Sequence, residues 1–163
     1  MNLAKPKRDL LGQVLLLLWL SLFAYGPIGL GGFSYDDVPL IIENPYLRTA
    51  EGIWDLPKVG RPIRALSFWL DYQIWGLNSR NFHRVNHLLH IFCVLSAYFL
   101  VRMIFLNQRI AFLSAFIYAL NPINSEAVCN ISHRKEMLCF FFLCLSLMTF
   151  KKSSDNRLWL VIS

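Results

Sequence analysis

Two adjacent carboxylates, Asp36 and Asp37, are the first residues of this sequence whose types and spacing could do chemistry. They lie in the stretch Ser34-Tyr35-Asp36-Asp37, shortly after the first long apolar segment. A membrane helix would release the chain into water at this point. Two acids in that position indicate the beginning of an active site.

A basic cluster, Ser132-His133-Arg134-Lys135-Glu136, lies between two later apolar segments. If successive apolar segments cross a membrane in alternation, this cluster falls on the same side as Asp36. Basic residues there run against the positive-inside trend. They suggest contact with an anion such as a phosphate, which arginine binds through paired hydrogen bonds. The alternative is a solvated helix start, and the sequence leaves both open.

The third apolar segment, 110–120, is too short to cross a bilayer, and Asn121-Pro122 then interrupts it. It reaches spanning length only if it continues to about Ile131. Irregular backbone at membrane depth is tolerated where it is buried in protein or lines a cavity. An ionisable residue there is a functional candidate, which singles out Glu126. Alternatively, the helix ends at Pro122 and Glu126 lies in an exposed loop.

Three histidines, His83, His87 and His90, are spaced so that one helix would place them on a single face. Such spacing could form a zinc site. The alternative is a polar helix end at the membrane interface, and no carboxylate or cysteine occupies a matching position. A metal-binding membrane protein is therefore the weakest of the functions considered.

The composition determines which elements can position these residues. The chain of 163 residues is 56% hydrophobic and only 16% charged, with a mean hydropathy of +0.45. These values predict an all-α, polytopic helical membrane protein. The net charge of +6 could indicate a nucleic-acid partner, but the basic residues gather at the ends of apolar runs, where they act as topology signals.

We expect about four transmembrane helices and a truncated fifth. Residues 1–163 would be the N-terminal portion of a longer transmembrane domain. The predicted spans are 10–25, 88–106, 110–131, 136–150 and a partial one from 158, with an external loop at 26–82. Basic residues before the first span place the N-terminus in the cytosol. The external loop would then face the lumen or the periplasm.

Within that loop, apolar residues recur at helical spacing between Pro62 and Gly76. The stripe consists of Ile63, Leu66, Leu70, Ile74 and Leu77. Proline favours a helix start and glycine a helix end, so an amphipathic helix is predicted. It would lie in the membrane interface or, alternatively, pack on the protein's own core.

The order and spacing of several short motifs resemble membrane glycosyltransferases of the GT-C superfamily. The similarity is to the protein O-mannosyltransferase-like group that includes the transmembrane and tetratricopeptide-repeat proteins. The matching residues are Asp36-Asp37 with Asn44, Arg61-Pro62-Ile63, Phe68-Trp69-Leu70-Asp71, Phe82-His83 with Asn86, Leu89 and His90, Ala119-Leu120-Asn121-Pro122-Ile123, Glu126-Ala127-Val128 and Arg134.

The resemblance implies transfer of a sugar, such as mannose, from a polyprenyl-phosphate donor to a hydroxyl of a protein or glycan acceptor. Asp36 or Asp37 would be the general base. Arg84, His133 and Arg134 would hold the lipid phosphate, and Glu126 would orient the acceptor or one of these cations. The resemblance specifies no cofactor and leaves a divalent cation open. The membrane would be the endoplasmic reticulum or the bacterial inner membrane.

The sequence departs from the family pattern in two ways. Asn121 and Asn124 stand where the family usually has histidine, so no role of those histidines carries over. The family's enzymes also have roughly twice as many spans. We therefore expect a fragment, a truncated product or one half of a split enzyme. The alternative is a non-catalytic membrane subunit that retains the front half of the fold.

Overall fold

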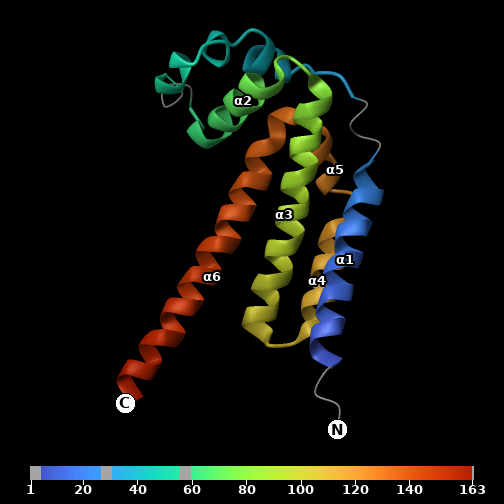
Figure 1. Ribbon diagram of the computed structural model, residues 1–163, viewed down its shortest axis with the longest axis vertical. Helices are drawn as coiled ribbons and strands as arrows, with labels where there is room; N and C mark the ends of the chain where they lie inside the picture. Colours follow the sequence, from blue (N-terminus) through green and yellow to red (C-terminus); the bar gives the residue numbers. More distant parts are fainter. Residues whose placement is uncertain (1–4, 27–30, 56–59, 163) are drawn as a thin grey trace.

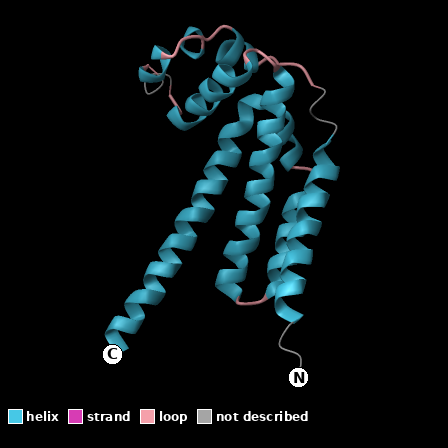
Figure 2. Cartoon of the chain, viewed as in Figure 1, coloured by secondary structure: helices cyan, strands magenta, loops and turns pink. Residues whose placement is uncertain are grey.

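The computed structural model of the chain describes residues 5–26, 31–55 and 60–162, and all regular structure in these ranges is helical (Figure 2). The prediction of an all-α fold is confirmed. The longer helices are α1 (Lys5–Tyr25), α2 (Pro62–Trp75), α3 (Ser79–Phe105), α4 (Gln108–Leu120), α5 (Asn124–Cys129) and α6 (Arg134–Ile162). Short helical turns are η2 (Val38–Ile42), η3 (Pro45–Leu47), η4 (Glu51–Trp54) and η6 (Ile131–His133).

Figure 1 shows that α1, α3 and α4 lie side by side, while α6 starts beside α3 and diverges from it toward the C-terminus. A head region, which we define as residues 31–55 and 60–76, lies across the end of the bundle where α3 and α6 begin. Both termini lie at the opposite end. Successive long helices therefore alternate in direction.

In the part of the chain that the structure describes, two helical segments are long and apolar enough to cross a membrane, Ser79–Phe105 and Ile131–Ser154. The apolar helices Leu10–Tyr25 and Gln108–Leu120 are shorter. The prediction of four full spans is thus not confirmed, because two of the described helical segments meet the requirement of about 20 apolar residues. The length and apolarity of these two segments support a membrane location.

Helix α4 ends at Leu120 because Asn121-Pro122 follows it. Proline has no backbone N–H and cannot bond to the carbonyl four residues earlier, which is that of Tyr118. The side-chain amide of Asn124 donates to this carbonyl instead, at 2.6 Å. Asn121 accepts from the backbone N–H of Ile123 at 3.1 Å and so begins the next turn. The segment predicted at 110–131 is therefore α4, a turn and the short helix α5.

The contact between α4 and its neighbours depends on small side chains. Alanines 111, 115 and 119 of α4 recur every four residues and are fully buried. They form one cluster with Leu17 of α1 and Val94 and Tyr98 of α3. Alanine allows close approach of helix axes and loses little side-chain entropy on burial.

Helix α2 confirms the predicted start at Pro62 and ends at Gly76, which adopts a φ of 60° that glycine readily tolerates. Its predicted apolar stripe is exposed, with Ile63 at 54% and Ile74 at 63%. The face that packs inward carries Ala65, Phe68 and Asp71 instead. The stripe therefore does not pack in the protein's own core, and its exposure favours a location of α2 in the membrane interface.

Helix α6 is continuous from Arg134 to Ile162. The sequence predicted a span at 136–150 and a new apolar run from 158. The polar residues between these runs continue the same helix. Residues 27–30 and 56–59 of the predicted external loop lie outside the described residues.

Gly52 provides a test of how tightly the head region is packed. A Cβ atom on Gly52 would lie 1.9 Å from the backbone oxygen of Tyr46, so η3 and η4 approach each other closely there. We expect Gly52→Ala to lower the free energy of unfolding by about 1–3 kcal/mol. Gly12→Ala is the matched control, because nothing lies within 4 Å of its added Cβ. It should raise helix stability by up to about 1 kcal/mol.

Detergent-solubilised protein unfolded by denaturant, followed by circular dichroism, measures both variants. Equal stability of the two alanine variants would contradict the close approach at Gly52.

Candidate active site

Arg134, the first residue of α6, is fully buried in the junction between the head region and the bundle. Its Nη1 atom lies 2.6 Å from Oδ2 of Asp71, which is itself buried on the inner face of α2. Removing a charge from water costs several kcal/mol unless it is paired and hydrogen bonded. The pair therefore requires the further contacts that surround it.

The other donors of the Arg134 guanidinium are also engaged by protein groups. Nε donates to Oδ1 of Asn86 at 2.7 Å, Nη2 to the backbone oxygen of Phe82 at 3.0 Å, and Nη1 also to the hydroxyl of Ser67 at 3.2 Å. These partners come from α3 and α2. A single side chain thus joins three helices.

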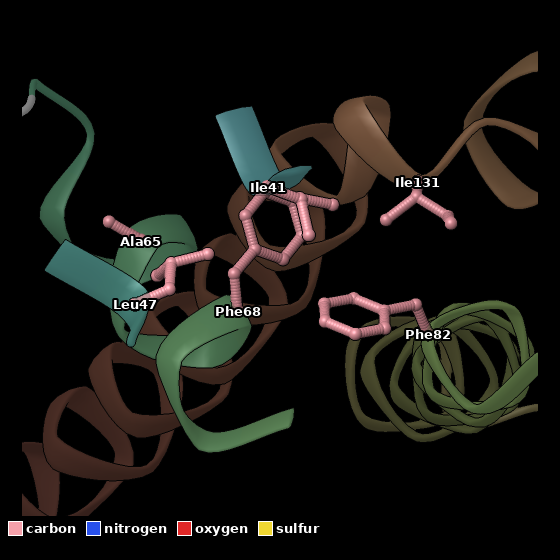
Figure 3. Close-up of a cluster of buried hydrophobic side chains, with 6 residues drawn as sticks. All are labelled: Ile41, Leu47, Ala65, Phe68, Phe82 and Ile131. Carbon is pink, nitrogen blue, oxygen red and sulfur yellow. The ribbon is translucent and has the colours of Figure 1, made fainter. Parts of the chain in front are cut away.

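Aromatic rings cover the guanidinium. Its central carbon lies 4.7 Å from the ring centre of Phe68 and 5.8 Å from that of Phe82. Figure 3 shows these two rings in the buried cluster, with Phe68 on α2 and Phe82 on α3. The remaining members are Ile41, Leu47, Ala65 and Ile131. Rings at this distance stabilise a cation and exclude water from the ion pair.

Burial raises the pKa of Asp71 above its ordinary value, and the charge and hydrogen bond of Arg134 oppose that shift. Desolvation disfavours a lone carboxylate, whereas the neighbouring cation favours it. The carboxylate therefore depends on Arg134 to stay ionised. Loss of either partner would leave an unpaired buried charge.

The candidate carboxylates Asp36 and Asp37 occupy the turn before η2 and have opposite environments. Asp37 is fully buried, and its Oδ2 accepts from the backbone N–H of Ser34 at 2.7 Å and from the Ser34 hydroxyl at 2.9 Å. Asp36 is exposed to solvent. Asp37 is close enough to Arg134 for their charges to interact. The turn is thus fixed by Asp37 and presents Asp36.

Asn130 links this turn to the Arg134 site. Its Oδ1 atom lies 3.2 Å from the hydroxyl oxygen of Ser34, and its backbone oxygen accepts from the amide of Asn86 at 3.1 Å. Asn86 in turn accepts from Arg134. Segments from the head region, α3 and the chain before η6 therefore meet in one hydrogen-bonded network.

The second carboxylate oxygen of Asp37 has neither a hydrogen-bond donor nor a paired cation among the contacts described above. Within the described part of the chain, Oδ1 of Asp37 is buried and has no hydrogen-bond partner. A buried acceptor left without a partner costs about 1–3 kcal/mol. Such unsatisfied groups are rare in folded proteins and are expected mainly where function requires them.

The other predicted binding residues lie toward the surface. Oε1 of Glu126 is 3.6 Å from Nδ1 of His133, and the Glu126 side chain is 75% exposed. The helix ends before Pro122, as the alternative interpretation predicted, but Glu126 lies on the short helix α5 and not in a loop. Arg84 is exposed on α3 and donates to Asn81 at 3.0 Å. Arg134 alone of the predicted cations points into the core.

The structure does not bring the three histidines together as a metal site. Their Nε2 atoms contact three different backbone oxygens, those of Gly32, Ser21 and Ala119 for His83, His87 and His90. Among the described residues, no group of three histidine, cysteine, aspartate or glutamate side chains could hold a metal ion.

Sequence reasoning gave no role to Asp71, the partner of Arg134. A signal was present, because Asp71 falls at helical spacing with Ala65 and Phe68, and this face is the buried one. An acid among apolar residues on a packed face requires a buried cation. The sequence offered several basic residues and could not select Arg134 among them.

The fold and the site together define an all-helical protein of membrane type, with adjacent carboxylates held at one end of the bundle. Among known proteins, the chain is similar to protein O-mannosyl-transferases. It is 31% identical over 162 residues to protein O-mannosyl-transferase TMTC1 of Mus musculus and 30% identical over 162 residues to that of Homo sapiens, which covers 89% of this chain in both cases. Protein O-mannosyl-transferase TMTC3 of Mus musculus is 30% identical over 158 residues, or 86% of this chain.

These alignments confirm the resemblance to O-mannosyltransferases that the motifs indicated. The chain spans 17% of the length of mouse TMTC1, 18% of human TMTC1 and 16% of mouse TMTC3. No family model matches the chain, and no solved structure matches it.

The buried ion pair leads to a prediction about stability. Arg134→Met leaves Asp71 buried without its counter-charge, and Asp71→Asn does the same to Arg134. Each should lower the free energy of unfolding by about 3–5 kcal/mol. The double variant Arg134→Met with Asp71→Leu should cost less than the sum of the single changes, because no charge remains buried.

Glu136→Gln is the control, because the pair of Lys135 and Glu136 is wider, at 3.8 Å, and Glu136 is 61% exposed. Its effect should stay within about 0.5 kcal/mol. Denaturant titration in detergent micelles measures all four proteins. An Arg134→Met variant as stable as the control would contradict the role of the ion pair.

Proposed function

We propose that this chain forms part of a glycosyltransferase of the GT-C type, which transfers a sugar from a polyprenyl-phosphate carrier to an acceptor hydroxyl. The single observation that carries the proposal is the exposed Asp36 beside the buried, anchored Asp37 at the end of a helical bundle. Sequence similarity to protein O-mannosyl-transferases supports it and favours mannose as the sugar.

In this proposal Asp36 is the catalytic base. Its carboxylate takes the proton of the acceptor hydroxyl as the hydroxyl oxygen forms a bond to the anomeric carbon of the sugar. The bond from that carbon to the phosphate oxygen breaks, and the carrier phosphate leaves with the electron pair. A base must be reachable by the acceptor, which Asp36 satisfies and Asp37 does not.

Asp37 is assigned a positioning role. Its hydrogen bonds with Ser34 set the conformation of the turn, and its charge interacts with that of Arg134. Arg134 then acts through Asp37 and Asp71, because its own donors are occupied by protein groups. A fixed backbone beneath the base keeps the reacting carboxylate oriented.

The accessible residues of the site are proposed to bind substrate. Arg84 and His133 would face the negative charge that grows on the departing phosphate. Glu126 would orient His133, to which it is already close, or the acceptor.

The proposed arrangement in the membrane is multi-pass, with the N-terminus in the cytosol and the head region on the lumenal or periplasmic side. The alternating directions of α1, α3, α4 and α6 and the common end of both termini support it (Figure 1). Further spans of the fold would come from a continuation of the chain or from a partner that supplies the other half of the enzyme. A protein or glycan is the proposed acceptor.

The test uses membrane vesicles from cells that express the full chain, compared with vesicles that lack it. The vesicles receive mannosyl-phosphoryl polyprenol with radiolabelled mannose, and label transferred to protein is measured. Asp36→Asn should lower the transfer rate by about 100-fold or more, because it removes the base. Glu43→Gln is the matched control, an exposed acid in the same head region, and should leave the rate unchanged.

Asp37→Asn should lower both the rate and the yield of folded protein, since its role is structural. If Asp36→Asn transfers mannose as fast as the unchanged chain, Asp36 is not the base. If vesicles with the chain show no transfer above those without it, the non-catalytic membrane subunit is the better description.

A further inference from the structure

A pocket of about 680 Å³ lies between the first turn of α2 and the N-terminal half of α6. Three cationic residues line it: Arg61, Arg64 and Lys135. One acid, Glu136, also lines it, so the local charge is three positive and one negative. No residue of the Ser34–Asp37 turn is part of the lining, which separates the pocket from the candidate active site.

The protein neutralises only one of the three cations of the pocket. Lys135 pairs with Glu136 at 3.8 Å, whereas Arg61 and Arg64 form no ion pair within the described residues. Arg64 donates weakly to the backbone oxygen of Ser132, at 3.4 Å, and its Nε is buried without a hydrogen-bond partner among the described residues. The pKa of Arg64 is lowered below its usual value, mainly by burial and to a smaller extent by the positive charge of Arg61. Like charges held together in a partly buried site favour an anion between them.

The backbone at the mouth of the pocket is held in an unusual conformation. Arg61 has a φ of 53°, in the left-handed region that residues with a Cβ rarely adopt. This conformation places the Arg61 side chain at the start of α2, beside Pro62 and Arg64. Strained backbone is retained where the surrounding structure requires it, often at binding sites.

The rest of the pocket wall is mostly apolar, and the larger part of it belongs to a candidate membrane span. Cys139, Leu143 and Ser146 recur at helical spacing along α6, with Phe142 beside them. From Lys135 to Ser146 the wall extends roughly 16 Å along the helix. The cations lie near the N-terminal end of the segment Ile131–Ser154, at the depth where a bilayer has its headgroups.

From charge and shape together, we propose that this pocket binds an anionic glycerophospholipid, with its phosphate among Arg61, Arg64 and Lys135 and its acyl chains along α6. The excess of positive charge selects an anionic headgroup over a zwitterionic one. The apolar wall selects a lipid over a free phosphate. The site is independent of the proposed sugar transfer.

The chain contains a probe and an internal control for this proposal. Cys139 is exposed and lines the pocket, whereas Cys129 is exposed on α5 and does not. The full chain in dodecylmaltoside micelles is alkylated with N-ethylmaleimide, with phosphatidylglycerol or phosphatidylcholine added. Peptide mass spectrometry gives the rate at each cysteine. Phosphatidylglycerol should slow the reaction of Cys139 by about fivefold and leave that of Cys129 within about twofold.

The double variant Arg64→Gln with Lys135→Gln should lose this protection, and the affinity for phosphatidylglycerol should fall by about tenfold or more. Arg80→Gln with Arg109→Gln removes the same charge from exposed positions outside the pocket and should keep the protection. Native mass spectrometry supplies a second readout. The unchanged chain should retain one phosphatidylglycerol molecule and the pocket variant none.

Four outcomes would overturn the proposal. Protection by phosphatidylcholine as strong as that by phosphatidylglycerol would show an apolar surface without headgroup recognition. Protection that survives in the pocket variant would remove the role of the cations. A polyprenyl monophosphate that displaces phosphatidylglycerol would assign the pocket to the sugar donor. A Cys139 that is unreactive before any lipid is added would show that another protein segment covers the site.

Discussion

The ion pair of Arg134 and Asp71 is the interaction on which the junction between the head region and the bundle depends. A guanidinium and a carboxylate placed out of water must be compensated almost completely. Asn86, Ser67 and the Phe82 carbonyl supply the remaining hydrogen bonds, and the Phe68 and Phe82 rings exclude solvent. Because these partners come from α2, α3 and α6, satisfying one charge fixes the relative positions of three helices.

The order imposed at Arg134 extends to the turn with the two candidate carboxylates. Asn86 contacts both Arg134 and the backbone of Asn130, and Asn130 contacts Ser34, which holds Asp37. The consequence is that two neighbouring aspartates have different roles. Asp37 is committed to the structure, while Asp36 remains in water and free to meet a substrate. Burial, and not chemical identity, distinguishes the two.

Helix α2 serves two environments at once. Its inner face carries Asp71 and Phe68 to the ion pair, and its outer face presents an apolar stripe and, at the first turn, Arg61 and Arg64. Such a helix is suited to the boundary between protein, headgroups and acyl chains. The proposed lipid site and the proposed catalytic site therefore share one helix, although they lie on different parts of it.

Local features of the sequence determined the helical class, the start and end of α2 at Pro62 and Gly76, and the interruption at Asn121-Pro122, because proline, glycine and apolar periodicity act over a few residues. The sequence also singled out Asp36, Asp37 and Arg134. Which of these would be exposed, and that Arg134 pairs with Asp71, 63 positions earlier in the chain, was decided only by the tertiary structure. The pocket of Arg61, Arg64 and Lys135 likewise joins residues far apart in sequence. Burial and ion pairing depend on contacts between distant segments, and a local pattern carries no information on which segments will meet.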